Sequence, residues 1–447
     1  MITGNEAQNQ RRAPRVVDGK SLLLGVPQLP KAPISVPTQE GAINLRDDGI
    51  LDGHILVLGG IGQGKSNVIY HLLDCVQATM GNNDVAVIFD PKGDYLRFRR
   101  PGDIVINDPA GEDEQPWNLL AELAAAGGTK AGDAGVEDRE ETASEIAHTL
   151  FDEANQRTQQ IFFPMAAMQL FAATLRHPEM LLGGSDDVTK LSNASIVRYW
   201  NERSQEQIAK DLQRWMDTKG LAHYISSEAP AQSMGVLSQI VQVVGDVFLG
   251  RFRDPGTFSI REAVRNRGGH CIFIEYRIRA GRALAPLYRI LIDLAIKEAL
   301  TSPLPANGRV YLFLDEFRLL PRLMHLDNGV SFGREFGLRF IAGMQTHNQV
   351  KVAFGDEAES ILASFNTVFA FRTANPDTRT FIQGITGHNK KLYIHSVIPG
   401  QTLQQIEDGQ VIEDYHVWDL QKGQAIVFLP NQEPFIAKIE LHPKKRG

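Results

Sequence analysis

The stretch Gly59-Gly60-Ile61-Gly62-Gln63-Gly64-Lys65-Ser66 follows an apolar run at residues 54–58 and opens a segment of helical periodicity at residues 66–79. Its spacing matches the pattern G-x-x-x-x-G-K-[ST] of phosphate-binding loops, which lie between a strand and a helix. The glycines allow consecutive backbone N–H groups to turn inward around phosphate oxygens, and the helix adds its positive N-terminal end. The sequence therefore predicts a nucleotide site on a strand–loop–helix unit.

The residues of this loop have distinct expected roles. Lys65 supplies positive charge to the β- and γ-phosphates, and the Ser66 hydroxyl is a ligand for Mg²⁺. A chance match in a glycine-containing loop is the alternative, but the flanking strand and helix argue against it. The expected nucleotide contacts are Gly60, Ile61, Gly62, Gln63, Gly64, Lys65, Ser66 and Asn67.

An acidic pair, Asp315 and Glu316, follows another apolar run at residues 310–314. Asp315 is expected to hold Mg²⁺ through water, and Glu316 to orient or deprotonate the attacking water. An acidic turn after a core strand is the plain alternative, but together with the loop the pair favours a nucleotide hydrolase. The glutamate after the aspartate indicates a motor-type ATPase. The absence of an N-K-x-D guanine signature favours ATP over GTP.

The composition is that of an ordinary globular protein. The chain has 447 residues, of which 43% are hydrophobic and 22% are charged. Its net charge of −7 excludes a globally basic nucleic-acid binder but allows a locally basic groove. Two cysteines far apart in sequence exclude a disulfide framework and fit a reducing compartment. Because no apolar run reaches about twenty residues, we expect a soluble cytoplasmic protein without a transmembrane helix.

Strand and helix signals divide the chain into four parts. Residues 1–50 are polar and rich in proline, which predicts an irregular arm with one short strand at residues 21–24. Residues 51–120 and 255–447 alternate strand and helix signals and end in a short basic tail, so they predict a doubly wound, mainly parallel α/β sheet. Residues 121–254 are expected to form an inserted all-α domain.

The apolar pattern also gives expected bounds for the individual elements. The expected strands are residues 54–58, 85–89, 104–106, 271–274, 310–314, 338–342, 367–371 and 424–428. The expected helices are residues 66–79, 119–126, 137–152, 160–176, 196–215, 234–248 and 284–300.

Four segments around the loop and the acidic pair identify a family. In chain order they are Asp90-Pro91-Lys92-Gly93-Asp94, Trp117-Asn118, Leu314-Asp315-Glu316-Phe317, and Gly333-Arg334-Glu335-Phe336-Gly337 followed by Gly343-Met344-Gln345-Thr346. With these residues the sequence resembles the type IV coupling proteins, which are TraD/TraG-type conjugation ATPases within the FtsK/HerA group of ring motors. The resemblance covers residues 51–120 and roughly 255–430. It implies a RecA-like P-loop NTPase domain with an all-α insertion.

The resemblance assigns roles to further residues. Gln345 matches the sensor glutamine that contacts the γ-phosphate or the lytic water, and an amide can both donate and accept there. Arg334 matches the arginine finger, which in a ring reaches the neighbouring subunit's site. Arg372, after another apolar run, is a rival for that role. The resemblance implies that Asp90 lies near the phosphates or the subunit interface, and the alternative is that it closes a Pro-Lys-Gly turn.

The resemblance implies a Mg²⁺-dependent ATP-hydrolysing motor that assembles as a homo-hexamer. Such a motor moves single-stranded DNA, with or without attached protein, toward a secretion channel, and meets secretion-channel and DNA-processing proteins. DNA contacts are expected to be sequence-tolerant, because no recognition-helix or zinc-finger signature is present. Coupling proteins usually begin with two transmembrane helices. Since this sequence shows none, we expect peripheral attachment to the inner membrane through partners.

Three other functions fit the same motifs. The first is a duplex DNA pump or processing ATPase of the FtsK/HerA group. The second is a protein-substrate adaptor ATPase of a secretion machine, without a DNA role. The third is a monomeric nucleotide switch. The basic cluster at residues 92–100 carries interleaved aromatic residues that suit single strands, but the interpretation as a solvated helix face or an interface salt-bridge patch is favoured.

Overall fold

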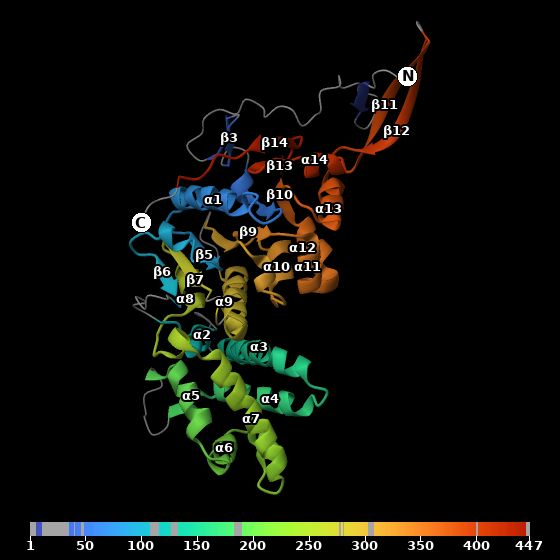
Figure 1. The fold of residues 1–447 in the computed structure, drawn as a ribbon. Helices are drawn as coiled ribbons and strands as arrows, with labels where there is room; N and C mark the ends of the chain where they lie inside the picture. The colour runs from blue at the N-terminus through green and yellow to red at the C-terminus, as the bar shows by residue number, and fades with distance from the viewer. Residues whose placement is uncertain are drawn as a thin grey trace. The chain divides into compact units, whose positions relative to one another are not determined.

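The computed structural model describes residues 6–10, 35–39, 41–45, 49–107, 116–126, 133–182, 190–276, 279, 281–302, 308–398 and 401–443. The chain folds into two compact units (Figure 1). It begins in the first unit, passes into the second and then returns to the first. The first unit comprises Met1–Ala86, Ala306–Arg322 and Leu326–Gly447, and the second Val87–Pro305 and Leu323–His325. The all-α domain predicted at residues 121–254 lies inside the second unit, which also takes in residues 87–120 and 255–305.

The first unit contains a mainly parallel run of strands in the order β14-β13-β10-β4-β9-β8. Their bounds are β4 (His54–Leu58), β8 (Val310–Leu314), β9 (Leu338–Met344), β10 (Phe365–Phe371), β13 (Gln424–Phe428) and β14 (Phe435–Lys438). Strands β10, β4, β9 and β8 pair in parallel, whereas β13 and β14 add antiparallel pairings. Every residue of β4, β8 and β9 is buried, as expected for parallel strands covered on both faces.

Helices lie on both sides of these strands, with α1 on one side of β9 and α10 to α12 on the other (Figure 1). The helices are α1 (Lys65–Thr79), α10 (Leu326–Ser331), α11 (His347–Phe354), α12 (Ala358–Ala363), α13 (Pro376–Thr386) and α14 (Asp414–Trp418). This arrangement places the carboxyl ends of the parallel strands at one edge. The predicted strands at residues 54–58, 310–314, 338–342, 367–371 and 424–428 are confirmed.

The prediction of an irregular arm over residues 1–50 is wrong where β2 (Ser35–Thr38) and β3 (Gly41–Asn44) form an antiparallel pair. Proline usually indicates an interrupted strand, but Pro37 takes part through its carbonyl oxygen, which accepts from the Glu440 N–H at 3.0 Å. Its missing N–H therefore removes no strand hydrogen bond. The strand predicted at residues 21–24 lies outside the described residues. Strand β14 was not predicted either. Nor were β1 (Glu6–Gln10), β11 (His388–Ile398) and β12 (Gln401–Gln410), which pair in the order β1-β11-β12.

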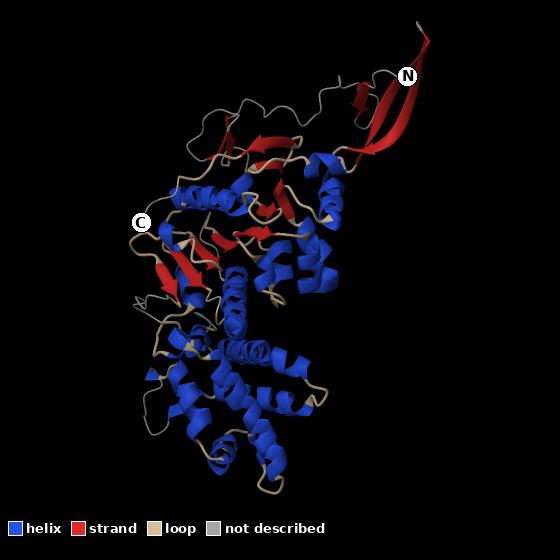
Figure 2. Cartoon of the chain, viewed as in Figure 1, coloured by secondary structure: helices blue, strands red, loops and turns tan. Residues whose placement is uncertain are grey.

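Helices make up most of the second unit (Figure 2), together with strands in the order β5-β7-β6. The strands are β5 (Val85–Asp90), β6 (Ile104–Ile106) and β7 (Cys271–Glu275). The helices are α2 (Leu119–Ala125), α3 (Asp133–Arg157), α4 (Phe162–Arg176), α5 (Asn193–Glu202), α6 (Gln205–Leu212), α7 (Pro230–Val247), α8 (Ile260–Asn266) and α9 (Gly281–Thr301).

The single helix predicted at residues 196–215 is wrong, because the chain breaks between α5 and α6. Ser204 caps α6, since its hydroxyl accepts from the Gln207 N–H while the Gln207 side chain returns to the Ser204 N–H. The other predicted helices are confirmed apart from shifts at their ends. None of the helices in the described part of the chain combines the length and the apolar composition needed to cross a bilayer.

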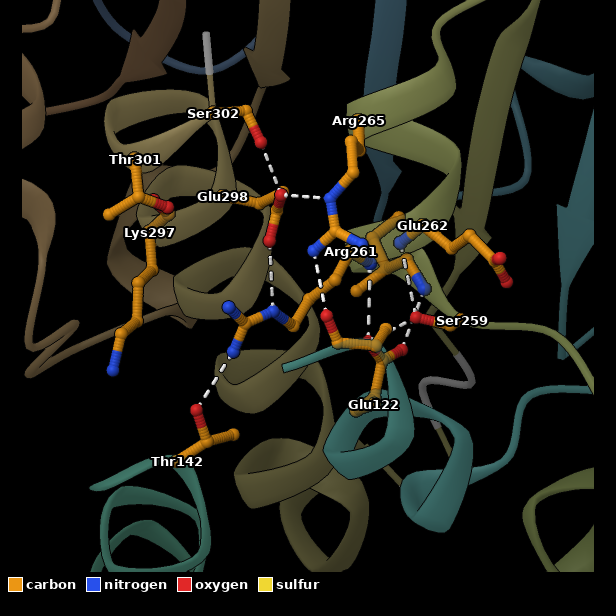
Figure 3. Close-up of polar contacts among 12 residues, drawn as sticks. Glu122, Thr142, Ser259, Arg261, Glu262, Arg265, Lys297, Glu298, Thr301 and Ser302 are labelled. Carbon is orange, nitrogen blue, oxygen red and sulfur yellow. Dashed lines mark hydrogen bonds and ion pairs between the residues drawn. The ribbon is translucent and has the colours of Figure 1, made fainter. Parts of the chain in front are cut away.

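A buried charged network joins α2, α8 and α9 inside the second unit (Figure 3). The fully buried Glu122 carboxylate accepts from Trp117 Nε1 at 2.6 Å and from Ser259 Oγ at 2.7 Å. It lies at the start of α8, where free N–H groups favour a negative charge, although burial raises its pKa. Arg261 of α8 then donates to Glu298 of α9 at 3.0 Å. Trp117 therefore has a structural role here.

Candidate nucleotide site

The loop between β4 and α1 takes backbone conformations that side chains rarely adopt. The φ angles of Gly59, Gly62 and Gly64 are 150°, 73° and 124°. A Cβ at Gly59 would lie 2.6 Å from the Cβ of Phe371, so this position requires glycine. Ile61, at the outer turn, is 81% exposed. The loop therefore has the open, glycine-dependent shape of a phosphate cradle.

Lys65 and Ser66 are the first residues of α1. The Lys65 side chain points into the loop, and the Ser66 side chain points toward the end of β8. Lys65 is buried, and its Nζ donates to the carbonyls of Gly59 at 2.8 Å and Gly60 at 3.0 Å. The ammonium group thus lies inside the curve of the loop, where the motif places the β- and γ-phosphates. Ser66 Oγ donates to Asp315 Oδ2 at 2.9 Å. The hydroxyl and the carboxylate form a pair of hard oxygen donors, which fits the ligand preference of Mg²⁺.

Glu316 is held by donors from two sides. Gln345 Nε2 lies 3.1 and 3.0 Å from its two carboxylate oxygens, and Arg318 Nε lies 2.7 Å from Oε1. Because β8 and β9 are parallel neighbours, the residues that follow their carboxyl ends meet. The structure therefore brings the predicted base and the predicted sensor together. Arg318 was not predicted, and its only sequence signal was its position two residues after Glu316.

Gly343 allows β9 to approach the acidic pair closely. It lies opposite Val57 of β4, and its neighbour Ala342 lies opposite Leu314 of β8. A Cβ on Gly343 would lie 2.4 Å from the Asp315 carbonyl oxygen and 2.9 Å from Asp315 Oδ1. The absence of a side chain at Gly343 thus sets the position of a candidate Mg²⁺ ligand.

The two candidate arginine fingers lie at opposite edges of these strands. Arg334 is exposed in the turn before β9, and its carbonyl accepts from Arg339 Nη1 at 2.9 Å. Gln345 follows the other end of β9, which at about 3.3 Å per residue is about 23 Å away. Arg334 is therefore out of reach of its own chain's loop. Arg372 follows β10, and its carbonyl accepts from the Gly60 N–H at 2.9 Å. Its guanidinium carbon lies 5.1 Å from the centre of the Trp418 ring.

Asp90, at the end of β5, closes a turn within the second unit. Its carboxylate accepts from the backbone N–H groups of Lys92 at 3.1 Å, Asp94 at 3.1 Å and Tyr95 at 2.6 Å. Burial raises its pKa, while these backbone donors oppose that shift. Since the carboxylate is engaged by its own turn, the geometry favours the turn alternative over a phosphate contact.

At the far end of β4, His54 is a packing residue. Its Nδ1 accepts from the Phe340 N–H at 3.1 Å, and its Nε2 lies 3.1 Å from the Val330 carbonyl oxygen. Burial, helped by the charge of Arg339, lowers its pKa to about 4. The imidazole is therefore neutral at physiological pH, and it lies at the edge opposite the loop.

Residues 46–391 match the family described as type IV secretion-system coupling protein DNA-binding domain. The coupling protein TraD of Escherichia coli (strain K12) is 26% identical over 350 residues, which cover 75% of this chain and 44% of TraD. This chain thus spans less than half the length of that relative.

Solved structures with the same fold include the bacterial conjugative coupling protein TrwBdeltaN70 in its unbound monoclinic form. It has a TM-score of 0.71 and 22% identity, and the match covers 93% of this chain and 91% of that chain. TrwB in complex with the ATP analogue ADPNP has a TM-score of 0.68 and 23% identity, with the same coverage. VirB4 of Thermoanaerobacter pseudethanolicus has a TM-score of 0.53 and 13% identity, covering 93% and 98%. The predicted RecA-like α/β P-loop fold with a helical region is therefore confirmed.

Proposed function

Because the chain belongs to the family of type IV secretion-system coupling proteins, we propose that it hydrolyses ATP to move DNA toward a secretion channel. The observation that carries this proposal is the 2.9 Å hydrogen bond from Ser66 Oγ to Asp315 Oδ2. These residues are 249 positions apart, and their contact joins the glycine loop and the acidic pair into one site. TrwB has been solved with ADPNP, and with ADP and Mg²⁺, which supports the same ligands here.

Nucleotide binding is proposed to redirect Lys65. Its ammonium donates to two neutral carbonyls of the loop, at 2.8 and 3.0 Å. Phosphate oxygens are charged acceptors and form stronger hydrogen bonds with an ammonium group, so they should replace these carbonyls. Ser66 and Asp315 would hold Mg²⁺, which when bound neutralises charge on the phosphate oxygens. The backbone N–H groups of residues 61–66 and the start of α1 would complete the cradle.

Glu316 is proposed to accept a proton from the attacking water. Gln345 and Arg318 aim its carboxylate from two sides, so the base is oriented before the substrate arrives. The same Gln345 amide can turn toward a γ-phosphate, which would release one constraint on Glu316. Gln345 would in this way report the presence of the third phosphate to the base.

The proposed assembly is a homo-hexameric ring that binds single-stranded DNA. Arg334 lies at the edge opposite its own loop, so it could act as the finger only on a neighbour's nucleotide. Arg372, bonded through its carbonyl to Gly60, is the candidate that remains near its own loop. A net charge of −7 is compatible with DNA when basic side chains face the inside of a ring.

Location and partners complete the proposal. Cys75 and Cys271 are both buried and form no disulfide, which fits a reducing cytoplasm. Secretion-channel and DNA-processing proteins are the proposed partners, and they would attach the motor peripherally to the inner membrane.

ATP binding and turnover of two variants test the site. Lys65→Ala should lose nucleotide binding, because the ammonium that neutralises the phosphates is gone. Glu316→Gln should keep binding but lose turnover by about 10²-fold or more, the contribution of a general base. Wild-type turnover in Lys65→Ala would refute the loop assignment.

The nucleic-acid substrate is tested by adding DNA to the wild-type protein at low salt. Stronger stimulation of turnover by single strands than by duplex supports the proposed substrate. The reverse order supports a duplex pump. No stimulation by either, with binding to secretion components retained, supports a protein-substrate adaptor.

A further inference from the structure

A pocket of about 690 Å³ lies beside the glycine loop within the first unit. Its size is in the range of small-molecule sites. The residues that line it come from the loop, from α1 and from the ends of three strands. They include Gln63, Gly64, Asn67, Phe371, and residues 422–423 and 438–441.

The order of residues along the loop indicates which part of a nucleotide would enter this pocket. Lys65 and Ser66 serve the β- and γ-phosphates and Mg²⁺, and Ser66 contacts Asp315. The pocket is lined by Asn67, one residue further along α1, and by neither of the acidic residues. A nucleotide with its terminal phosphate at the acidic pair must extend away from that pair. Its ribose and base would therefore enter this pocket.

The walls of the pocket suit a base. Phe371 and Ile439 are buried, while Leu441 is 86% exposed and leaves an apolar surface at the pocket. Lys422 and Lys438 add positive charge to the lining. This combination of apolar and positively charged side chains favours a ligand that carries both a flat ring and negative charge, as a nucleotide does.

One wall of the pocket belongs to residues 439–442, which directly follow β14 and are here named the 439–442 strap. The Asn67 amide holds it at two points, because Nδ2 donates to the Glu440 carbonyl and Oδ1 accepts from the His442 N–H, each at 2.8 Å. His442 Nε2 lies 2.7 Å from Asp74 Oδ2. His71 Nε2 lies 3.0 Å from the Glu440 carbonyl oxygen. Three side chains of α1 thus anchor the strap.

We propose that the 439–442 strap is a wall of the binding pocket for the base and ribose of the nucleotide, and that α1 holds it in place. This inference rests on the proposed function, since it needs phosphates on the glycine loop. It assigns the Asn67 side chain to the strap, whereas the sequence predicts that Asn67 contacts the nucleotide directly. Binding of a bare phosphate chain would not require the strap.

The test compares the affinities of ADP and inorganic tripolyphosphate, measured by calorimetry with Mg²⁺. Leu441→Asn should weaken ADP binding about tenfold, the usual effect of losing an apolar contact in a pocket. Its affinity for tripolyphosphate should not change. Asp74→Asn should also weaken ADP binding and leave tripolyphosphate binding unchanged, because it removes the charge that pairs with His442 of the strap. Val352→Asn is the matched control, since Val352 is 88% exposed on α11 and does not line the pocket.

The outcomes separate this inference from the proposed function. Unchanged ADP affinity in both Leu441→Asn and Asp74→Asn overturns the inference, and so does an equal loss of tripolyphosphate affinity. A wild-type protein that binds neither ligand overturns the proposed function and the inference together. A wild-type protein that binds both ligands, with ADP affinity lost selectively in the two variants, supports both.

Discussion

Replacing Gly343 by alanine should damage the candidate site through a single added methyl group. Its Cβ would lie 2.4 Å from the Asp315 carbonyl oxygen, where ordinary contacts are 3.4–4 Å, so the two strands must separate by about 1 Å. Separation is difficult because all of β9 is buried and paired with β4 and β8 on either side. The same methyl group would lie 2.9 Å from Asp315 Oδ1, and would therefore displace that carboxylate.

The expected size of the effect follows from this geometry. Overpacking of a close-packed core costs about 1–3 kcal/mol. The total stability of a domain is about 5–15 kcal/mol, so the Gly343→Ala variant should still fold. A shift of about 1 Å at a catalytic group can lower turnover about 10²-fold. Since Asp315 is a candidate Mg²⁺ ligand, half-maximal turnover should also require more Mg²⁺.

Urea unfolding and ATP turnover over a Mg²⁺ series measure the two effects separately. Gly384→Ala on α13 is the matched control, because a Cβ there meets nothing within 4 Å. Its stability should stay equal or rise by up to about 1 kcal/mol, with unchanged turnover. If Gly343→Ala shows wild-type stability and wild-type Mg²⁺ dependence, Asp315 does not lie against β9 as described and the reasoning is refuted.

Two further predictions concern Arg334 and Asp293, which is a buried residue of α9. The Arg334→Ala variant by itself should have no turnover. Turnover should return when it is mixed with Lys65→Ala subunits, because their intact Arg334 would reach the neighbouring site. No recovery at any mixing ratio would exclude the trans role. Burial raises the pKa of Asp293 from 3.8 to about 6, so the folded state binds its proton more tightly than the unfolded state does. The stabilisation that comes from this bound proton is present below pH 4 and is lost as the pH rises through 6. The free energy of unfolding of the wild type should therefore fall by about 2–3 kcal/mol between pH 4 and 6, relative to that of Asp293→Asn. Parallel pH profiles of the two proteins in denaturant titrations would contradict this.

Local patterns predicted most of the elements, and the two main errors have different causes. The break between α5 and α6 comes from the cap at Ser204, a local signal that the apolar periodicity of residues 196–215 hid. The β2–β3 pair was missed because Pro37 suggested an irregular arm. Its carbonyl bonds Glu440, which is about 400 residues away in the chain. A window of neighbouring residues contains no information about such a partner.

The candidate site shows the same difference between features set by neighbouring residues and features set by distant contacts. The loop glycines, Lys65 and Ser66 could be found from spacing, because a phosphate cradle is made by consecutive backbone groups. The role of the strap could not be found, because it depends on a contact between separate elements. Arg318 is a local neighbour of Glu316, but no motif marks an arginine at that position as functional. The sequence suggested Arg334 as a finger, but only the direction of β9 shows that it faces away from its own loop.

The amino-acid sequence alone determined the strand–loop–helix unit of the nucleotide site, the class of fold and the identity of the acidic pair. These features depend on residues that are adjacent or regularly spaced, so their physics is local. Tertiary structure decided that Ser66 meets Asp315, that Gln345 meets Glu316 and that Asn67 holds Glu440. Such contacts form only when strands align in one register and bring their carboxyl ends to a common edge, which depends on the packing of the whole unit.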